Sequence, residues 1–293
     1  MKSKISAIHY VVISIILLLI NSSCEKVIKL DLNSENPKII IEAPIDIDSS
    51  THRIIIKQTV NFDSEVGGVP ITTADVSLSN GTNSIKFNHA SNGEYIANTP
   101  LDFFSSNKSY ELNVNVNGKT YSASSNCPTT LIPLDSIGVY KQKTFGRYNY
   151  SVVALRNETP KGVPNWYQYK AKKNGVKINK ILFDDDQNLD GVTVTRKPIF
   201  DLPEFSPDTI VNDLPKFIVK ENGGITLKDS VELELTLVNI EYKVYRYFFN
   251  LVLNQGGRQS ATPSNPDPLF TNGALGYFSV QKSYTKKKWI NTK

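Results

Sequence analysis

Hydrophobic and polar residues alternate in short runs over the first half of the chain. In residues 110–116 every second residue is apolar, beginning with Tyr110 and ending with Val116, and the residues between them are polar. This period of two is typical of a strand with one buried and one solvated face. The runs that are β-rich or follow this pattern are residues 27–32, 38–43, 53–60, 74–79, 84–87, 94–97, 110–116 and 120–123.

Turn residues separate these runs and indicate how the strands connect. Asn80-Gly81 and Asn117-Gly118 each lie between two predicted strands, and Asn-Gly favours the type I′ turn of a two-residue hairpin. No helical periodicity interrupts the strands. We therefore predict an immunoglobulin-like antiparallel sandwich over residues 24–130.

The second half of the chain is also rich in predicted strands. Pro128 and Pro133 indicate a domain boundary near residue 130. Beyond it we predict a second β-rich domain over residues 131–293. Pro198, Pro203, Pro207 and Pro215 predict a long loop or an irregular sheet edge. The predicted strands of this half are residues 136–141, 148–156, 166–172, 176–183 and 231–238.

One helix is predicted in the second domain, over about residues 240–255. Apolar residues recur there at helical spacing, as at Val244, Phe248 and Leu251. Asn239 is the predicted N-cap, and Gly256-Gly257 would end the helix.

The first residues have the pattern of a lipoprotein signal peptide. Lys2 and Lys4 precede an almost wholly apolar stretch over residues 5–20, which is short for a membrane span. Small residues then precede Cys24. We interpret residues 1–23 as a signal peptide and Cys24 as the lipidated first residue of the mature chain, with two or three acyl chains giving a stable anchor. The alternative is an uncleaved N-terminal anchor, and both interpretations place the protein outside the cytoplasm.

Composition excludes several classes of protein. The 293 residues are 40% hydrophobic and 21% charged, values that exclude a disordered chain and a multi-span membrane protein. The net charge of +5 comes without a dense basic run, so we expect no nucleic-acid partner. Two cysteines cannot form a framework of several disulfides.

Candidate catalytic residues are few. His9 is lost with the signal peptide, and only His52 and His89 remain. The sequence contains no G-x-S-x-G elbow, no H-E-x-x-H motif and no phosphate-binding glycine loop. We interpret Cys127 as a buried, inert thiol. We therefore expect a non-catalytic protein, with calcium as the one cofactor that a motif suggests.

That motif is an acidic segment that begins at Asp184. Its spacing matches the first positions of a calcium loop, where alternating oxygen ligands face one ion. The match ends at Lys197, which replaces the bidentate glutamate. A plain hairpin turn is the alternative that we favour. The candidate metal ligands are Asp184, Asp186, Asn188 and Asp190.

Aromatic residues are concentrated in the second half. Tyrosine and tryptophan combine apolar area with a polar tip, so exposed examples make platforms for sugar rings or partner proteins. Strand alternation places Tyr167 and Tyr169 on one face and Trp166 on the other. We take these three as candidate ligand-binding aromatics. The alternative, which fits most aromatic residues of the chain, is a place in the core.

The order of several short motifs resembles a known family. A cysteine followed by Val27-Ile-Lys-Leu-Asp-Leu32 comes first. The remaining motifs are Pro70-Ile-Thr-Thr-Ala-Asp-Val-Ser-Leu-Ser-Asn-Gly81, Gly93-Glu-Tyr95, Tyr110-Glu-Leu112, Gly118-Lys-Thr-Tyr-Ser-Ala123, Ile132-Pro-Leu-Asp-Ser-Ile137, Phe183-Asp-Asp and Asn272-Gly-Ala-Leu-Gly-Tyr-Phe278. Together they resemble the Bacteroidota outer-membrane lipoproteins of domain-of-unknown-function family 4249. Residues 74–123 also look like the transthyretin-like sandwich of carboxypeptidase regulatory domains.

The resemblance implies a β-rich lipoprotein with no established activity, often encoded beside a TonB-dependent outer-membrane transporter. It also implies O-glycosylation at Asp-Ser/Thr-apolar tripeptides, which would modify Ser136, Thr209 and Ser230.

We therefore expect a protein held in the outer membrane by acylated Cys24, on its periplasmic face or at the cell surface. Its expected role is that of a non-catalytic accessory or binding subunit that works with a TonB-dependent transporter. One alternative is a glycan-binding or adhesin-type surface lipoprotein. A hydrolase that uses only carboxylates is a weaker alternative.

Overall fold

The computed structural model describes most of the chain after residue 35. Pro37–Lys293 form one compact unit. None of the described helices is both long and apolar enough to cross a membrane. The described residues are 36–60, 67–100, 102–105, 108–144, 147–157, 162–187, 198–201, 210–211, 214–215, 217–221, 224–228, 230–255 and 266–291. The strand predicted at residues 27–32 lies outside them.

The first half folds as the predicted sandwich. Its strands run in the order β1-β2-β6-β5-β4-β7-β8, each antiparallel to the next. β5 pairs with β4 through its first residues and with β6 through its last, so the sheet folds over itself into two layers. The strands are β1 (Ile39–Asp46), β2 (Thr51–Gln58), β3 (Val69–Pro70), β4 (Asp75–Ser79), β5 (Ser84–Ser91), β6 (Glu94–Asn98), β7 (Ser109–Val116) and β8 (Lys119–Asn126).

Alternation along these strands builds the first core. Every second residue of β7 is buried, as the sequence predicts, and Leu112 and Val114 are wholly inaccessible to solvent. Both pack in one cluster with Ile41, Ile54 and Val76 from the other strands. Burial of such side chains contributes about 1.5–3 kcal/mol each to folding.

The two predicted Asn-Gly turns have different outcomes. Asn117 and Gly118 have φ of 51° and 82° between the paired residues Val116 and Lys119, which confirms a two-residue hairpin. At Asn80 the prediction is wrong, because the turn there has four residues. The side chain of Asn80 accepts hydrogen bonds from the N–H groups of Thr82 and Asn83 and so stabilises the longer turn.

The second half has two layers of its own. β9, β10 and β14 form a three-stranded sheet, and its buried side chains pack in one core with those of β11 and β19. The predicted strand 176–183 is interrupted at residues 178–181. The elements are β9 (Ser136–Thr144), β10 (Arg147–Leu155), β11 (Trp166–Lys173), β12 (Val176–Lys177), β13 (Leu182–Asp185), β14 (Pro198–Asp201), β15 (Ile210–Val211), β16 (Leu214–Pro215), β17 (Phe217–Glu221), β18 (Gly224–Lys228), β19 (Ser230–Ile240), α2 (Tyr242–Gln255), η2 (Thr271–Gly273) and β20 (Leu275–Asn291).

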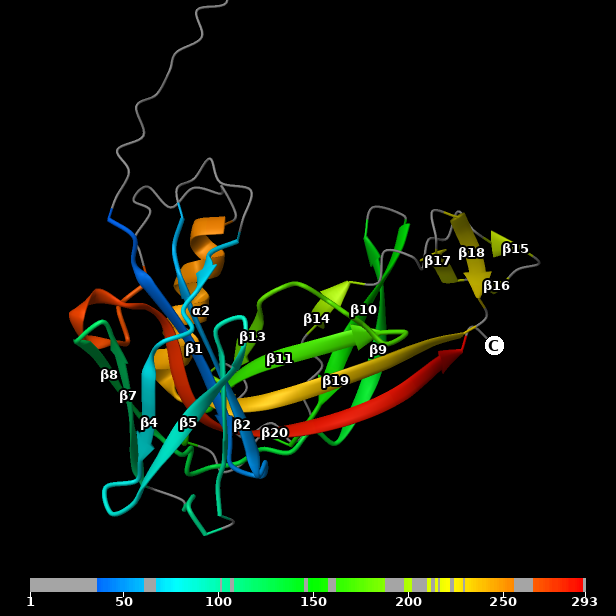
Figure 1. Cartoon of the computed structure of the whole chain (residues 1–293). Helices are drawn as coiled ribbons and strands as arrows, with labels where there is room; N and C mark the ends of the chain where they lie inside the picture. Colours follow the sequence, from blue (N-terminus) through cyan, green and yellow to red (C-terminus); the bar gives the residue numbers. More distant parts are fainter. Residues whose placement is uncertain are drawn as a thin grey trace, which may run out of the picture. The chain divides into compact units, whose positions relative to one another are not determined.

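A long C-terminal strand joins the two halves. β20 is parallel to β1 along residues 275–281 and antiparallel to β19 along residues 282–291. Figure 1 shows this strand, in red, following β1 and then β19. The whole path β12-β11-β19-β20-β1-β2 is therefore one continuous sheet. β20, which follows the predicted boundary near residue 130, lies beside β1, which precedes it. The boundary itself stays a prediction.

The predicted helix is confirmed, but its predicted cap is wrong. α2 begins at Tyr242, and the carbonyl of Glu241 accepts hydrogen bonds from the N–H groups of Val244 and Tyr245. Asn239 is still part of β19, and its amide binds the backbone of Ile132 instead. The helix packs against β11, β13 and β20 through a third apolar cluster (Figure 1).

Gly276 makes the junction between β1 and β20 possible. It has φ of +102°, and a Cβ at this position would lie 2.0 Å from the carbonyl oxygen of Ile41. Gly81 has a similar φ of +86° but has open space around it. A comparison of substitutions at Gly276 and Gly81 therefore separates the effect of crowding around the added Cβ from the effect of the positive φ.

We expect Gly276→Ala to lower the free energy of unfolding by about 3 kcal/mol or more, since strain and overpacking add. Gly81→Ala should cost only the left-handed conformation, about 1–2 kcal/mol. Urea denaturation of both variants measures this difference. Equal losses would show that β1 and β20 do not approach each other as closely as described.

Candidate functional site

Three segments distant in sequence enclose a pocket beside the start of α2. They are residues 126–130 at and after the end of β8, residues 163–166 at the start of β11, and residues 239–243 from the end of β19 to the first turn of α2. The cavity has a volume of about 450 Å³, which is within the range of small-molecule sites. It therefore lies where the two sandwiches and the helix meet.

Hydrogen bonds to buried or half-buried side chains fix each of the three segments. Glu241 accepts from the N–H of Asn126 at 2.8 Å and from the hydroxyl of Ser125 at 3.1 Å. The Asn239 amide receives the N–H of Ile132 at 2.9 Å and donates to its carbonyl at 3.1 Å. Because these partners are more than 100 residues apart in the chain, the pocket exists only in the complete fold.

The third segment is fixed by Asp186. This carboxylate is 3% exposed and accepts from both the backbone N–H and the side-chain amide of Asn165, at 2.8 and 2.7 Å. Hydrogen bonds to a charged acceptor contribute about 1.5–3 kcal/mol. All three walls of the pocket are thus held in place without a ligand.

Aromatic rings form one wall and continue along α2. The ring centroids of Trp166 and Tyr242 lie 5.0 Å apart, and Tyr242 is 46% exposed. Tyr245 stacks next to Tyr242 at 6.4 Å, and Phe249 follows at 6.2 Å. Nε1 of Trp166 is buried and has no hydrogen-bond partner among the described residues. The pocket thus opens beside a row of aromatic rings.

Of the three predicted ligand-binding aromatics, only Trp166 lines the pocket. Tyr167 and Tyr169 are 0% and 2% exposed and belong to the second core. Their partner is Arg156, whose guanidinium lies 4.3 Å from the ring centre of Tyr167 and donates to the hydroxyl of Tyr169. The alternation predicted for this strand is confirmed, and it is what buries the two tyrosines.

The carboxylates of the acidic segment bind other side chains of the protein. Asp184 pairs with Arg156 at 3.0 Å, and both side chains are almost wholly buried. Asp185 accepts from the hydroxyl of Tyr245 at 2.6 Å. That contact and burial raise the pKa of Tyr245, burial being the larger cause. Among the described residues no three carboxylates, histidines or cysteines cluster as metal ligands do.

The remaining candidate ligands of calcium, Asn188 and Asp190, lie outside the described residues. Calcium binding stays a prediction. In the structure the carboxylates of Asp184 and Asp186 bind Arg156 and Asn165.

The histidines and the free cysteine are placed in structural roles. His52 is 2% exposed and shares a hydrogen bond with Thr99, and burial lowers its pKa. His89 packs edge to face on Tyr95. Cys127 contributes to the pocket wall but is 1% exposed, and burial raises the pKa of its thiol. A raised pKa lowers the fraction of reactive thiolate.

The predicted modification sites are only partly described. Ser136 and Ser230 are half-buried, each as the first residue of its strand, β9 and β19. Thr209 and the lipidation site Cys24 lie outside the described residues. O-glycosylation and acylation therefore stay predictions.

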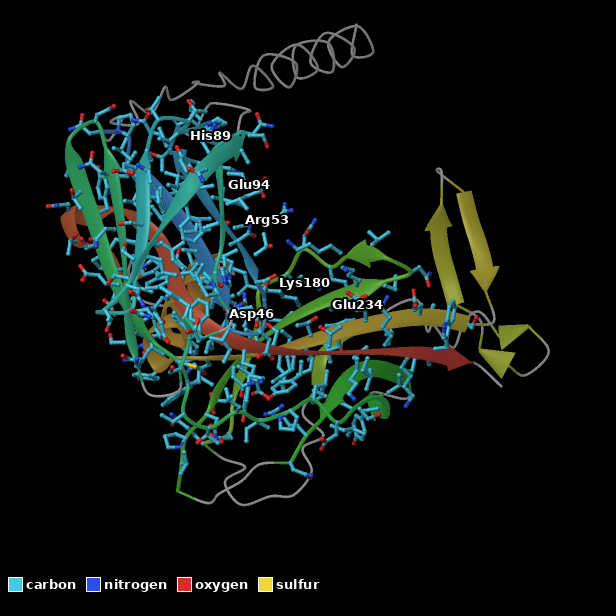
Figure 2. All side chains as sticks on the ribbon, turned by 60° about the horizontal axis from the view of Figure 1, so that its bottom comes forward. Asp46, Arg53, His89, Glu94, Lys180 and Glu234 are labelled. Carbon is cyan, nitrogen blue, oxygen red and sulfur yellow. The ribbon has the colours of Figure 1, made fainter. Side chains whose placement is uncertain are left out.

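Two groups of charged side chains away from the pocket are paired. Arg53 on β2 contacts Glu94 on β6 at 2.8 Å, and Figure 2 shows both side chains close together. Glu234 on β19 lies between Lys172 and Lys287, at 2.7 and 3.1 Å. Hydrogen bonds from these two lysines lower the pKa of Glu234. Exposed pairs of this kind are worth little energy and suit a solvated face.

Nothing in the sequence pattern identifies Glu241, Tyr242 or Asn239 as parts of one site with Asn126. Their contacts cross more than 100 residues. The available signal is local: a polar Asn-Ile-Glu-Tyr-Lys segment lies between an apolar strand and an apolar helix.

A comparison with known protein families supplies one match. Residues 25–287 match the family described as "Domain of unknown function (DUF4249)". No curated protein matches the chain.

The buried Arg156–Asp184 pair gives a test of the arrangement behind the pocket. We expect Asp184→Asn to lower the free energy of unfolding by about 3–5 kcal/mol, because it leaves a buried guanidinium without its carboxylate. Asp185→Asn is the matched control, and weakening its half-buried contact with Tyr245 should cost about 1 kcal/mol. Chemical denaturation measures both values, and similar losses would contradict the described pairing.

Proposed function

Since the chain belongs to the family described as domain of unknown function 4249, and this description names no activity, we propose its function from the pocket beside α2. The protein is a lipid-anchored, non-catalytic binding protein of the outer membrane, and this pocket captures a small ligand. The observation that carries the proposal is that the pocket is pre-formed, with each wall fixed by its own hydrogen bonds. Preorganised sites bind without a cost for ordering loops.

The chemistry of the lining supports binding rather than catalysis. A general base needs a free acceptor within reach of substrate. Glu241 uses its two oxygens for Asn126, Ser125 and Lys243. Cys127, the one thiol in the lining, is covered and has a raised pKa. The Glu241 carboxylate and the Cys127 thiol, which could act as a base or a nucleophile, are therefore used in contacts that hold the fold together.

The proposed location follows from the N-terminal pattern. A basic start, an apolar stretch of signal-peptide length and Cys24 after small residues support cleavage and acylation. The partners that we propose are the lipid of the outer membrane and a TonB-dependent transporter, to which the bound ligand would pass. The alternative is a surface lipoprotein of the adhesin type, which binds glycans without a transporter.

We expect Cys24→Ala to abolish incorporation of labelled palmitate and to release the protein from the membrane fraction, because acylation needs this thiol. Cys127→Ala is the matched control, since it removes the other cysteine. It should keep both the label and the membrane association. Labelling that survives Cys24→Ala would contradict the proposed anchor.

The partner is tested by purification through a mild detergent. We expect the anchored protein to co-purify in fixed stoichiometry with an outer-membrane transporter. An isolated monomer that binds glycans would instead support the adhesin-type alternative. Turnover of a substrate that one carboxylate substitution abolishes would contradict a non-catalytic role.

A further inference from the structure

We propose that the pocket beside α2 takes a neutral, polyhydroxylated ring, that is, a pyranose sugar or a short glycan built from such rings. This inference rests on the proposed function, because it names the ligand class of the same pocket. Three features of the pocket support it: an aromatic wall, several neutral polar side chains in the lining, and charges that are already compensated within the protein.

The aromatic wall suits a ring with one apolar face. Tyr242 is 46% exposed at the edge of the pocket and packs against Trp166 at 5.0 Å. The C–H groups of a pyranose form an apolar face of about the size of an aromatic ring, while its hydroxyls point outward from the rim. Such a ring can bury its apolar face on Tyr242 or Trp166 and still satisfy its hydroxyls with neutral polar groups of the lining.

The lining also carries neutral polar groups. Asn126 is the last residue of β8, and Thr129 and Thr130 follow it. Amide and hydroxyl groups both donate and accept hydrogen bonds, as sugar hydroxyls do. A purely apolar ring would displace water from Asn126, Thr129 and Thr130 without replacing its hydrogen bonds, and would lose affinity.

The two charged residues of the lining compensate each other. Lys243 lies 3.2 Å from Glu241, and Glu241 also accepts two hydrogen bonds from β8. An anionic ligand would meet the Glu241 carboxylate, and a cationic ligand would meet the Lys243 ammonium. A buried charge without its own partner is costly, so the pocket favours a ligand without net charge.

The chain offers a direct reporter for this site. It contains two tryptophans, and Trp289 on β20 is 60% exposed and is not part of the pocket. Trp289→Phe in the full chain, purified in mild detergent, leaves Trp166 as the one source of tryptophan fluorescence. Saturation-transfer NMR gives a second readout that does not depend on fluorescence.

The probes separate the ligand classes. Neutral sugars are represented by the methyl glycosides of D-glucose, D-galactose and D-mannose, together with maltose and cellobiose. Glucuronate and glucosamine add a negative and a positive charge to a similar ring, and cyclohexanol removes most of the hydroxyls. We expect at least one neutral sugar to shift the Trp166 emission with a Kd on the order of 1 mM, which corresponds to about −4 kcal/mol.

Two tyrosine variants test the aromatic wall. Tyr242→Leu should weaken binding of that sugar at least tenfold, because it removes an aromatic face. Tyr140→Leu is the matched control, since Tyr140 is 41% exposed on β9 and is not part of the pocket lining, and it should change the Kd less than twofold. Thermal melting of both variants establishes that they are folded.

Each result bears on the inference. Tighter binding of cyclohexanol or of a charged sugar would overturn the ligand class and would leave the pocket as a binding site. Equal effects of Tyr242→Leu and Tyr140→Leu would overturn the aromatic wall as the contact. No signal from any probe in either readout would overturn the sugar inference, and co-purification with a transporter would then decide the proposed function on its own.

Discussion

The structure depends on the double pairing of β20. Its first seven residues continue the sheet of β1, and its last ten continue the sheet of β19. One strand therefore contributes Phe278 and Val280 to the first core, while Tyr284 and Ile290 pack against the second. Tyr277 packs on the cluster beneath α2. The close backbone contact at Gly276 is the condition for this arrangement, because any side chain there would separate β20 from β1.

Hydrogen bonds of buried polar groups then fix the position of β20 relative to its neighbours. Ser125 is wholly buried, accepts the N–H of Val280 at 2.9 Å and donates to Glu241. The Asn239 amide accepts from and donates to the backbone of Ile132, and the Asp186 carboxylate accepts from Asn165. An apolar junction of equal size could slide or repack, but buried polar groups must find particular partners or lose their hydrogen bonds. The pocket is thus enclosed by bonds that the fold itself requires.

Most of the strands could be predicted from the sequence, because alternation records which face is buried. β7 and β11 follow this rule along their whole length. β20 does not follow this rule. Residues 278–281 alternate between apolar and polar types, yet all four are buried in the structure. Residues 286–288 are lysines in a segment where the described residues provide a strand partner on one side only. Lysine at such a sheet edge opposes aggregation and also hides the strand from a hydrophobic pattern.

The candidate site was predictable only in part, for a related reason. Trp166 could be singled out as an aromatic residue on the face opposite Tyr167. Its neighbours in the pocket are ordinary polar residues, and their meaning comes from contacts that cross more than 100 residues. The order of events during folding follows from the same long separations. Ile40 lies beside Leu275, so a growing chain cannot complete its first sheet until its final strand has been made. The first sheet is therefore complete only once β20 is available, and a product that ends before β20 would leave one edge of β1 without a partner.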